Sequence, residues 1–491
     1  MGQRPKSGVW LPTNASLLGN VSLLIKFSMA SHFSLDVLKP ALQRRSRILP
    51  ILDAALDAVA PERAVMRVLR RSGDELRAGD RSYRLSDYRR VFVLAFGKAA
   101  APMARAALSL GLPIDDGLII TKYGHGPENP ADLASLRVAE AGHPSPDANG
   151  VSATLQAAEM LRIAAADDLV ILLVSGGGSA LLTLPAPGLT LDDMQRTTDL
   201  LLACGAAIDE INAVRKHLSQ VKGGQLARLA APATVISLIL SDVIGNPLDV
   251  IASGPAAPDP TTWADAWSVI EKYNLAEQLP VAVRRRLRAG LAGELPDTPK
   301  PGDPVFETVQ TVIVGDNAIA AEAARRAAAA QGFNASILST FVQGEAREVA
   351  QVLVGLGREV VAHQRPLTPP ACLILGGETT VTLRGRGKGG RNQEMALAAA
   401  IALAHAPEAA PIVIVALATD GTDGPTDAAG GMVDATSLQR GESAGLSARR
   451  HLDENNAYPW LKTIDDLLIS GPTRTNVNDL YFVFVFAEGN A

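Results

Sequence analysis

Three consecutive glycines stand between two serines in a segment that could bind an anion. Ser175, Gly176, Gly177, Gly178 and Ser179 directly follow a strand-sized apolar run. Consecutive glycines are conformationally costly, and they are expected where backbone N–H groups must approach a ligand closely. A group of N–H donors with hydroxyls beside it suits phosphate or carboxylate. A tight turn is the alternative reading. The segment matches neither the GxxxxGK[ST] loop nor the GxGxxG fingerprint.

Basic residues at three other places could neutralise such an anion. Lys98 follows a second apolar run, and Arg215 lies in the cation-rich segment 210–229. Arg391 ends a loop in which glycines alternate with basic residues, a pattern that suits an anion clamp at the start of a helix. Solvated side chains are the alternative at each place, and His217 is expected to be structural.

Carboxylates follow two further apolar runs. Asp242, Asp420 and Asp423 are candidates for binding Mg²⁺ or Mn²⁺, and Asp242 or Asp420 could instead take a proton from the substrate. Turn and capping roles for these aspartates are the alternative. Glu378 and Asn392 flank the basic glycine-rich loop, and we expect both to contact substrate or phosphate.

Alternating apolar runs and helical patterns predict the elements that position these residues. The chain is expected to be α/β, with two Rossmann-like domains and mainly parallel sheets. In such sheets, ligands bind beyond the carboxyl ends of the strands, where most of the motifs lie. Strands are predicted at 91–96, 117–121, 136–139, 169–174, 234–240, 311–314, 336–339, 372–375, 379–383, 412–418 and 480–486. Helices are predicted at 35–58, 98–108, 145–165, 191–202, 212–229, 317–331, 345–363 and 392–405.

A segment rich in proline, glycine and charge, at 290–304, is expected to link the two domains. The predicted domains are 35–295 and 305–486. Residues 1–34 are expected to be a disordered or misassigned extension, with Met29 as an alternative start.

The composition excludes several classes of function. The 491 residues are 47% hydrophobic and 20% charged, with a net charge of −5, which is typical of a globular protein without a nucleic-acid-binding patch. The apolar runs are too short to cross a membrane. The two cysteines, Cys204 and Cys372, stand in apolar surroundings and favour buried thiols and a cytoplasmic location.

Taken together, the motifs closely resemble those of the class II glycerate 2-kinases, whose C-terminal part is called the MOFRL domain. The resemblance covers about residues 36–486. It is carried by AFGKAA at 95–100, EAGHPSPD at 140–147, LVSGGGSALL at 173–182, INAVRKHLSQVKGGQLA at 211–227, LSDVIGNPLDVIASGP at 240–255, GGETTVTLRGRGKGGRNQE at 376–394, ATDGTDGPTDAAGG at 418–431 and GPTRTNVNDL at 471–480.

The resemblance implies ATP-dependent phosphorylation of D-glycerate at its 2-hydroxyl, in an active site between two domains. It also implies that the MOFRL region spans about 370–486. The family's candidate active-site lysine and arginine correspond to Lys98 and Arg391. Three local departures stand out: Asn246 where the family usually has aspartate, Leu375 where a serine is common, and Arg474 where most members have glycine.

Two other functions are compatible with parts of the pattern. The first is an NAD(P)H-dependent hydroxypyruvate reductase, which the lack of a dinucleotide fingerprint disfavours. The second is a non-catalytic sugar-acid-binding protein, which would not need paired aspartates together with lysine and arginine. The oligomeric state stays open, with a homodimer as one alternative.

Overall fold

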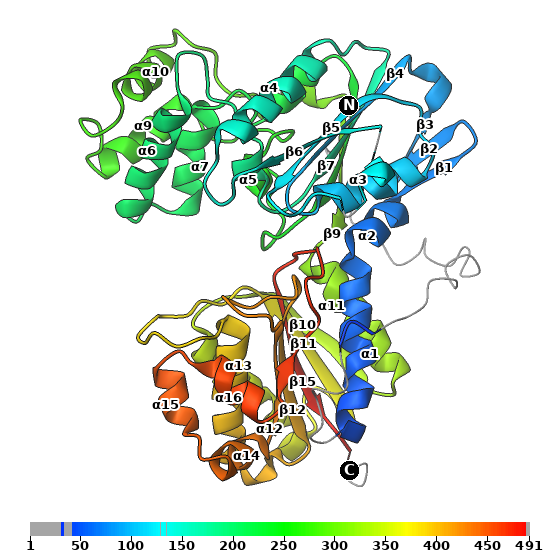
Figure 1. Cartoon of the computed structure of the whole chain (residues 1–491), viewed down its shortest axis with the longest axis vertical. Helices are drawn as coiled ribbons and strands as arrows, with labels where there is room; N and C mark the ends of the chain where they lie inside the picture. The colour runs from blue at the N-terminus through cyan, green and yellow to red at the C-terminus, as the bar shows by residue number, and fades with distance from the viewer. Residues whose placement is uncertain (1–30, 34–41, 128, 134, 488–491) are drawn as a thin grey trace, which may run out of the picture. The chain divides into compact units, whose positions relative to one another are not determined.

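The structure, a computed structural model, describes residues 31–33, 42–127, 129–133 and 135–487. The described residues form two compact units, one containing Pro61–Val314 and the other containing the segments up to Ala60 and from Gly315 onward. Each unit has helices around a six-stranded sheet (Figure 1). The expected extension at 1–34 lies outside the described residues apart from 31–33.

The sheet of the first unit has the strand order of doubly wound dinucleotide-binding folds. The order is β6-β5-β4-β7-β8-β9, and the pairs formed by β4 to β8 are parallel. The direction of chain progression reverses between β4 and β7, which creates the crevice where such folds bind ligands. The α/β class and the parallel sheet are therefore confirmed for this unit. The strands are β4 (Arg90–Phe96), β5 (Ile114–Lys122), β6 (Arg137–Ala141), β7 (Asp168–Val174), β8 (Thr234–Leu240) and β9 (Val309–Gly315).

Helices of the first unit pack on this sheet or form a separate cluster (Figure 1). The predicted helix 212–229 is two helices, because Gly223 and Gly224 both have positive φ and end the helical path. The helices are α2 (Pro61–Val68), α3 (Ala100–Ser109), α4 (Ala148–Arg162), α5 (Gly178–Leu181), α6 (Leu191–Ala203), α7 (Ile208–His217), α8 (Gln225–Ala230), α9 (Trp263–Lys272) and α10 (Val281–Leu291). A small antiparallel sheet of β1 (Leu69–Ser72), β2 (Glu75–Ala78) and β3 (Arg81–Arg84) was not predicted, because these strands are short and charged.

The second sheet is mixed, which corrects the expectation of mainly parallel sheets. Its order is β10-β11-β15-β12-β13-β14, and only β10 and β11 form a parallel pair. The last strand, β15, returns between β11 and β12 and runs antiparallel to both. The strands are β10 (Asn334–Val342), β11 (Ala371–Gly377), β12 (Ile412–Ala418), β13 (Gly430–Asp434), β14 (Leu467–Leu468) and β15 (Asp479–Val485).

Two details of the second unit also differ from the expected elements. The segment 379–383 is a loop, with only an isolated bridge from Thr380 to Glu345, because β10 and β15 already flank β11. β9 belongs to the sheet of the first unit, and α1 packs beside α11 in the second unit. The bounds of the compact units therefore differ from those of the expected domains, 35–295 and 305–486.

Helices lie on both faces of the second sheet, with α1 and α11 on one face and α12, α13 and α16 on the other (Figure 1). They are α1 (Leu42–Val59), α11 (Asn317–Ala330), α12 (Ala346–His363), α13 (Arg391–Ala404), α14 (Ser437–Ser443), α15 (Ala448–Asp453) and α16 (Ala457–Thr463). None of the helices in the described ranges is long and apolar enough to span a membrane.

A buried ion pair fixes α1 to the second unit. The Arg45 side chain is 1% exposed, and its Nη2 donates to Oδ1 of Asp466 at 2.5 Å. Asp466 also accepts from Arg440 at 2.9 Å and from Ser437 Oγ at 2.6 Å. Burial raises the pKa of Asp466, while Arg45 and Arg440 oppose that shift.

We expect Arg45→Met to destabilise the second unit by about 3 kcal/mol, because it leaves a buried carboxylate with one cation fewer. Arg44→Met on the same helix is the matched control, since Arg44 makes an exposed hydrogen bond to the carbonyl of Ala410. Urea titration with hydrogen exchange of the α1 amides measures both. Equal losses of unfolding free energy in the two variants would show that the buried ion pair stabilises the unit no more than the exposed hydrogen bond.

Candidate active site

The turns after β4 and β7 are joined by hydrogen bonds at the switch point of the first sheet. Lys98 N donates to Gly176 O at 2.9 Å, and Ser175 N donates to Phe96 O at 3.1 Å. Ala99 N donates to Ser175 Oγ at 3.0 Å. Ser175 is 1% exposed, and its hydroxyl bonds to the backbone, while the ligand contact expected for it stays a prediction. The two strands that flank the switch point therefore present Lys98 and the glycine turn as one rigid surface.

Three side chains surround the central glycines of this turn. A methyl group on Gly176 would lie 2.2 Å from Oδ2 of Asp242. Gly177 has φ +85°, and a methyl there would lie 3.0 Å from Cδ2 of His143 and 3.3 Å from Cγ of Lys98. The N–H groups of Gly176 and Gly177 have no hydrogen-bond acceptor within the described ranges. Glycine is required here by close approach, and the two N–H groups can bind an anion.

The end of the turn packs against the loop that follows β8. A methyl on Gly178 would lie 2.9 Å from Cβ of Ala252. Ser179 Oγ lies 3.0 Å from Ser253 Oγ, and Ser253 donates to Asn212 Oδ1 at 3.2 Å. These contacts connect the turn to the loop that carries Asp242 and to α7.

Lys98 and His143 both border Gly177, and they differ in charge. Lys98 is half-buried, and in the described part of the chain its ammonium forms no hydrogen bond or ion pair. Burial, followed by the charges of Lys98, Lys122 and His125, lowers the pKa of His143 to about 4. The imidazole is therefore neutral near pH 7, while the lysine charge is available for an anionic ligand.

Lys222 and Arg215 are close to one another on the other side of Ser179. Lys222 is 2% exposed and its Nζ donates to the carbonyls of Ser179 at 2.6 Å and Leu182 at 3.0 Å. Burial, assisted by Arg215, lowers the pKa of Lys222 to about 7. Arg215 makes only a 3.4 Å hydrogen bond to Thr198 among the described side chains. Lys222 thus supports the turn, while Arg215 lacks an ion-pair partner in the described ranges and keeps the expected capacity to bind an anion.

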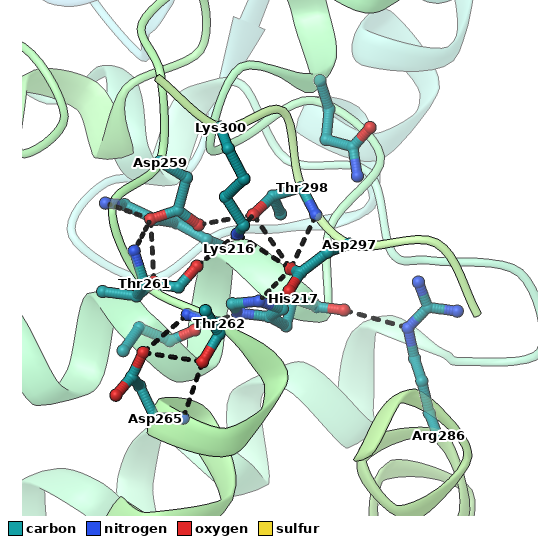
Figure 2. Close-up of polar contacts among 12 residues, drawn as sticks. Lys216, His217, Asp259, Thr261, Thr262, Asp265, Arg286, Asp297, Thr298 and Lys300 are labelled. Atoms are coloured by element: carbon teal, nitrogen blue, oxygen red, sulfur yellow. Dashed lines mark hydrogen bonds and ion pairs between the residues drawn. The ribbon is translucent and has the colours of Figure 1, made fainter. Parts of the chain in front are cut away.

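Other cations of segment 210–229 belong to a buried network, shown in Figure 2. Lys216 Nζ lies 3.1 Å from Asp249 and 3.2 Å from Asp259, and its side chain is 2% exposed. His217 Nε2 lies 2.8 Å from Asp297 Oδ1, and the imidazole is fully buried. His217 thus has the structural surroundings expected for it. Lys216 holds the loop after β8 against α7.

In the second unit, Arg391 is balanced by two carboxylates. Its Nε and Nη2 donate to both oxygens of Asp479, at 2.6 and 3.2 Å, and its Nη1 donates to Glu378 at 2.7 Å. Burial raises the pKa of Asp479 to about 6, against the effect of Arg391. Burial disfavours the guanidinium charge, but Asp479 and Glu378 outweigh it and raise the pKa of Arg391. The arginine is therefore held charged in one orientation with 31% of its side chain exposed.

Asn392 and Asp423 make hydrogen bonds at the start of α13, next to the pair formed by Arg391 and Asp479. Asp423 Oδ1 accepts from Asn392 N at 3.2 Å, and Oδ2 accepts from Gln393 N at 2.8 Å. Asn392 is fully buried and also donates to Asp479 Oδ1 at 3.0 Å. Burial raises the pKa of Asp423. Both residues therefore help to position Arg391 and Asp479, and the ligand contacts expected for them from the sequence stay a prediction.

The three candidate metal-binding aspartates are divided between the two units. Asp242 belongs to the first unit, and Asp420 and Asp423 belong to the second. Asp420 Oδ1 accepts from Thr422 N at 3.0 Å, which is the Asx turn given as its alternative. No group of three or more His, Cys, Asp or Glu side chains that could hold a metal ion is found within the described ranges.

Sequence reasoning did not select His143 or Asp479 as site residues. His143 is the second residue after β6, so its position at a strand end was the available signal. Asp479 faces Gly377 and Ala418 in the register of β15, which places it at the carboxyl ends of β11 and β12. That signal depends on β15 being antiparallel, which the local sequence pattern does not reveal.

Comparisons with known proteins show which family the chain resembles. Residues 47–288 match a domain of unknown function designated DUF4147, and residues 371–479 match the MOFRL family. The chain is 43% identical to the glycerate 2-kinase of Pyrococcus horikoshii, over 90% of this chain and 97% of the relative. It is also 43% identical to the D-glycerate 2-kinase of Thermotoga maritima, over 88% of this chain and 95% of the relative.

A protein of Agrobacterium vitis that is provisionally named hydroxypyruvate reductase is 41% identical over 81% of this chain and 87% of its own length. The crystal structure of a glycerate kinase from Thermotoga maritima matches with a TM-score of 0.80 at 40% identity, covering 90% of this chain and 99% of that chain. With relatives this similar over nearly their whole length, the chain belongs to the glycerate 2-kinase family.

Proposed function

We propose that this chain transfers the terminal phosphoryl group of ATP to the 2-hydroxyl of D-glycerate, giving 2-phosphoglycerate and ADP. The observation that carries the proposal is the gathering of Lys98, the glycine turn and Asp242 at the switch point of a doubly wound sheet. Phosphoryl transfer needs positioning and charge neutralisation more than covalent chemistry, and these groups provide both.

In this mechanism the first unit binds phosphate oxygens. The N–H groups of Gly176 and Gly177 donate to them, and the Lys98 ammonium balances their charge. Arg215, which has no ion-pair partner among the described residues, is assigned to a second anionic group such as the carboxylate of glycerate.

A divalent cation, Mg²⁺ or Mn²⁺, fits the residues at the turn. The Asp242 carboxylate packs directly on Gly176, and kinases hold Mg²⁺ through one or two carboxylates together with the phosphates of the nucleotide. The cation would neutralise phosphate charge. Asp423 is less suited to this role, because both of its oxygens already accept hydrogen bonds from α13. Asp420 remains the candidate from the second unit.

We also propose that Arg391, which belongs to the second unit, acts on the same phosphoryl transfer. The support for this step is the pre-orientation of the guanidinium by Asp479 and Glu378. A fixed guanidinium stabilises charge that develops on the transferred group without reorganising during the reaction.

The reductase and the sugar-acid-binding protein remain the alternatives that an experiment must separate. The free Lys98 charge and unpaired N–H groups favour a phosphate ligand over the nicotinamide chemistry of a reductase. A binding protein would contact the sugar acid but release no ADP.

We expect ADP release from ATP only when D-glycerate and Mg²⁺ or Mn²⁺ are both present, with loss of turnover in excess EDTA. A coupled ADP assay across a panel of hydroxy acids, with ³¹P NMR of the product, makes the measurement. Oxidation of NADH with hydroxypyruvate in the absence of ATP would support the reductase. Binding of glycerate without ADP release would support the binding protein.

We expect Lys222→Met to lower kcat/KM by roughly tenfold to a hundredfold, because two hydrogen bonds from a buried cation hold the end of the glycine turn. Lys272→Met is the control in the same unit, since Lys272 is exposed and pairs with Glu210 at the surface. Steady-state kinetics and thermal unfolding of both variants make the test. A loss of stability with unchanged kcat/KM would mean that Lys222 supports the fold alone.

We expect Lys98→Ala and Arg391→Ala each to lower kcat by roughly 100-fold or more, since each removes charge stabilisation from the transition state. The double variant should lose less than the product of the two losses, as residues that act together do. Arg391→Lys should not restore the rate, because lysine cannot pair with both oxygens of Asp479 in the same way. Losses that multiply fully in a kinetic double-mutant cycle would contradict a shared site.

A further inference from the structure

His143 packs against the glycine turn at Gly177. A methyl group on Gly177 would lie 3.2 Å from Nε2 of His143, whereas Asp242 approaches the neighbouring Gly176. The imidazole is half-buried, and neither ring nitrogen forms a hydrogen bond within the described ranges. A polar ring that packs against Gly177 of the turn and makes no hydrogen bond among the described residues is thus available to a ligand.

The loop that carries His143 is held at several points. Asp147 accepts from Tyr123 Oη at 2.6 Å and from Gly150 N at 2.9 Å, which caps the start of α4. Gln195 Nε2 donates to the carbonyl of Pro146 at 2.7 Å. The loop is therefore braced by β5, α4 and α6, and the position of the imidazole beside Gly177 is defined by the fold.

Burial is the largest cause that lowers the pKa of His143, and the charges of Lys98, Lys122 and His125 lower it further, so the imidazole is neutral at pH 7. The carboxylate of Asp147 lies beside the preceding residue, since a methyl group on Gly142 would be 3.2 Å from its Oδ2. A neutral imidazole has one nitrogen with a free lone pair, which can accept a hydrogen bond from a hydroxyl. Bound phosphate groups would offset the charge of Lys98 and so make His143 more basic when the substrates are present.

We propose that His143 is a catalytic residue that accepts the proton of the substrate hydroxyl. This inference rests on the proposed kinase function and assigns the base that the sequence left open between Asp242 and Asp420. The hydroxyl oxygen forms a bond to the γ-phosphorus of ATP while the bond from that phosphorus to the β–γ bridging oxygen breaks. ADP leaves with that electron pair, and the hydroxyl proton passes to the free ring nitrogen and then to solvent.

This assignment gives different roles to Asp242 and His143, the two polar side chains beside the turn. Asp242 lies at Gly176 and suits the cation and the phosphates, whereas His143 lies at Gly177 beside the Lys98 stem. A carboxylate that holds a cation is a weak base, so a separate neutral base is chemically useful. A base oriented in this way adds typically 10²–10⁴-fold to the rate.

We expect His143→Gln to lower kcat by roughly 100-fold or more with little change in KM for ATP, because glutamine can accept a hydrogen bond but not the proton. His363→Gln is the matched control, since His363 is exposed on α12 in the other unit, and its kcat should stay at the wild-type value. A His143→Gln enzyme with kcat within threefold of an active wild type would overturn the inference while leaving the kinase function intact. An inactive wild-type enzyme would instead overturn the kinase function itself.

Two further measurements use the wild-type protein and do not depend on the folding of a variant. Diethyl pyrocarbonate acylates neutral imidazoles, and peptide mass spectrometry can resolve the seven histidines of the chain. We expect His143 to be acylated in the free enzyme and protected by D-glycerate with a non-hydrolysable ATP analogue. Equal acylation with and without these ligands would contradict the inference. Retention of acid-labile label from [γ-³²P]ATP without glycerate, mapped to the peptide that contains His143, would show a covalent phosphohistidine and overturn the role of His143 as a base.

Discussion

The first unit depends on the hydrogen bonds that join the turn after β4 to the turn after β7. Lys98 N bonds to Gly176 O, and Ser175 supplies both an N–H donor and a hydroxyl acceptor to the β4 side. These bonds form because two adjacent parallel strands end at the same level on either side of the switch point. Any side chain at Gly176 or Gly177 would occupy the space of Asp242, His143 or Lys98. Crowding at one point of the sheet thus requires the glycines, and the N–H groups of Gly176 and Gly177 have no acceptor among the described residues.

The second unit reaches a comparable concentration of polar groups by a different route. Its key strand, β15, is antiparallel, so Asp479 at its start stands beside the ends of β11 and β12. Burial of that carboxylate is unfavourable without a partner, and Arg391 and Asn392 supply three hydrogen bonds to it. Asp423 in turn binds the first N–H groups of α13, the helix that carries Arg391. The arginine is therefore held by a buried frame of carboxylates and amides, in which loss of one member weakens the orientation of the others.

Local sequence patterns predicted the buried elements well and the connections between them poorly. The apolar runs 169–174, 234–240 and 412–418 coincide with β7, β8 and β12 apart from one residue at the start of β7, because fully buried strands have continuous apolar sequence. The glycine turn and Lys98 could be found for the same reason, since each follows such a run. The antiparallel direction of β15 could not be found, because strand direction is set by tertiary pairing. The role of Asp479 and the neutral state of His143 could not be predicted either, because both depend on neighbours that are distant in the sequence. Asn392 and Asp423 were identified by residue type, but their burial beneath Arg391 depends on packing.

Under the proposed function, the two units contribute differently, because their cationic side chains differ in whether a carboxylate balances their charge. Arg391 has its charge balanced by Asp479 and Glu378, whereas Lys98 and Arg215 have no carboxylate partner among the described residues. An uncompensated cation in a partly buried position is stabilised when an anion binds, so the first unit favours the binding of ATP and glycerate over the free state. A compensated arginine gains less from ground-state binding, but it is already oriented, so its interaction can increase as charge develops on the transferred group. Substrate affinity would then depend mainly on Lys98 and Arg215, and stabilisation of the transition state on Arg391. His143 would act on the proton, because burial and its cationic neighbours keep the imidazole unprotonated.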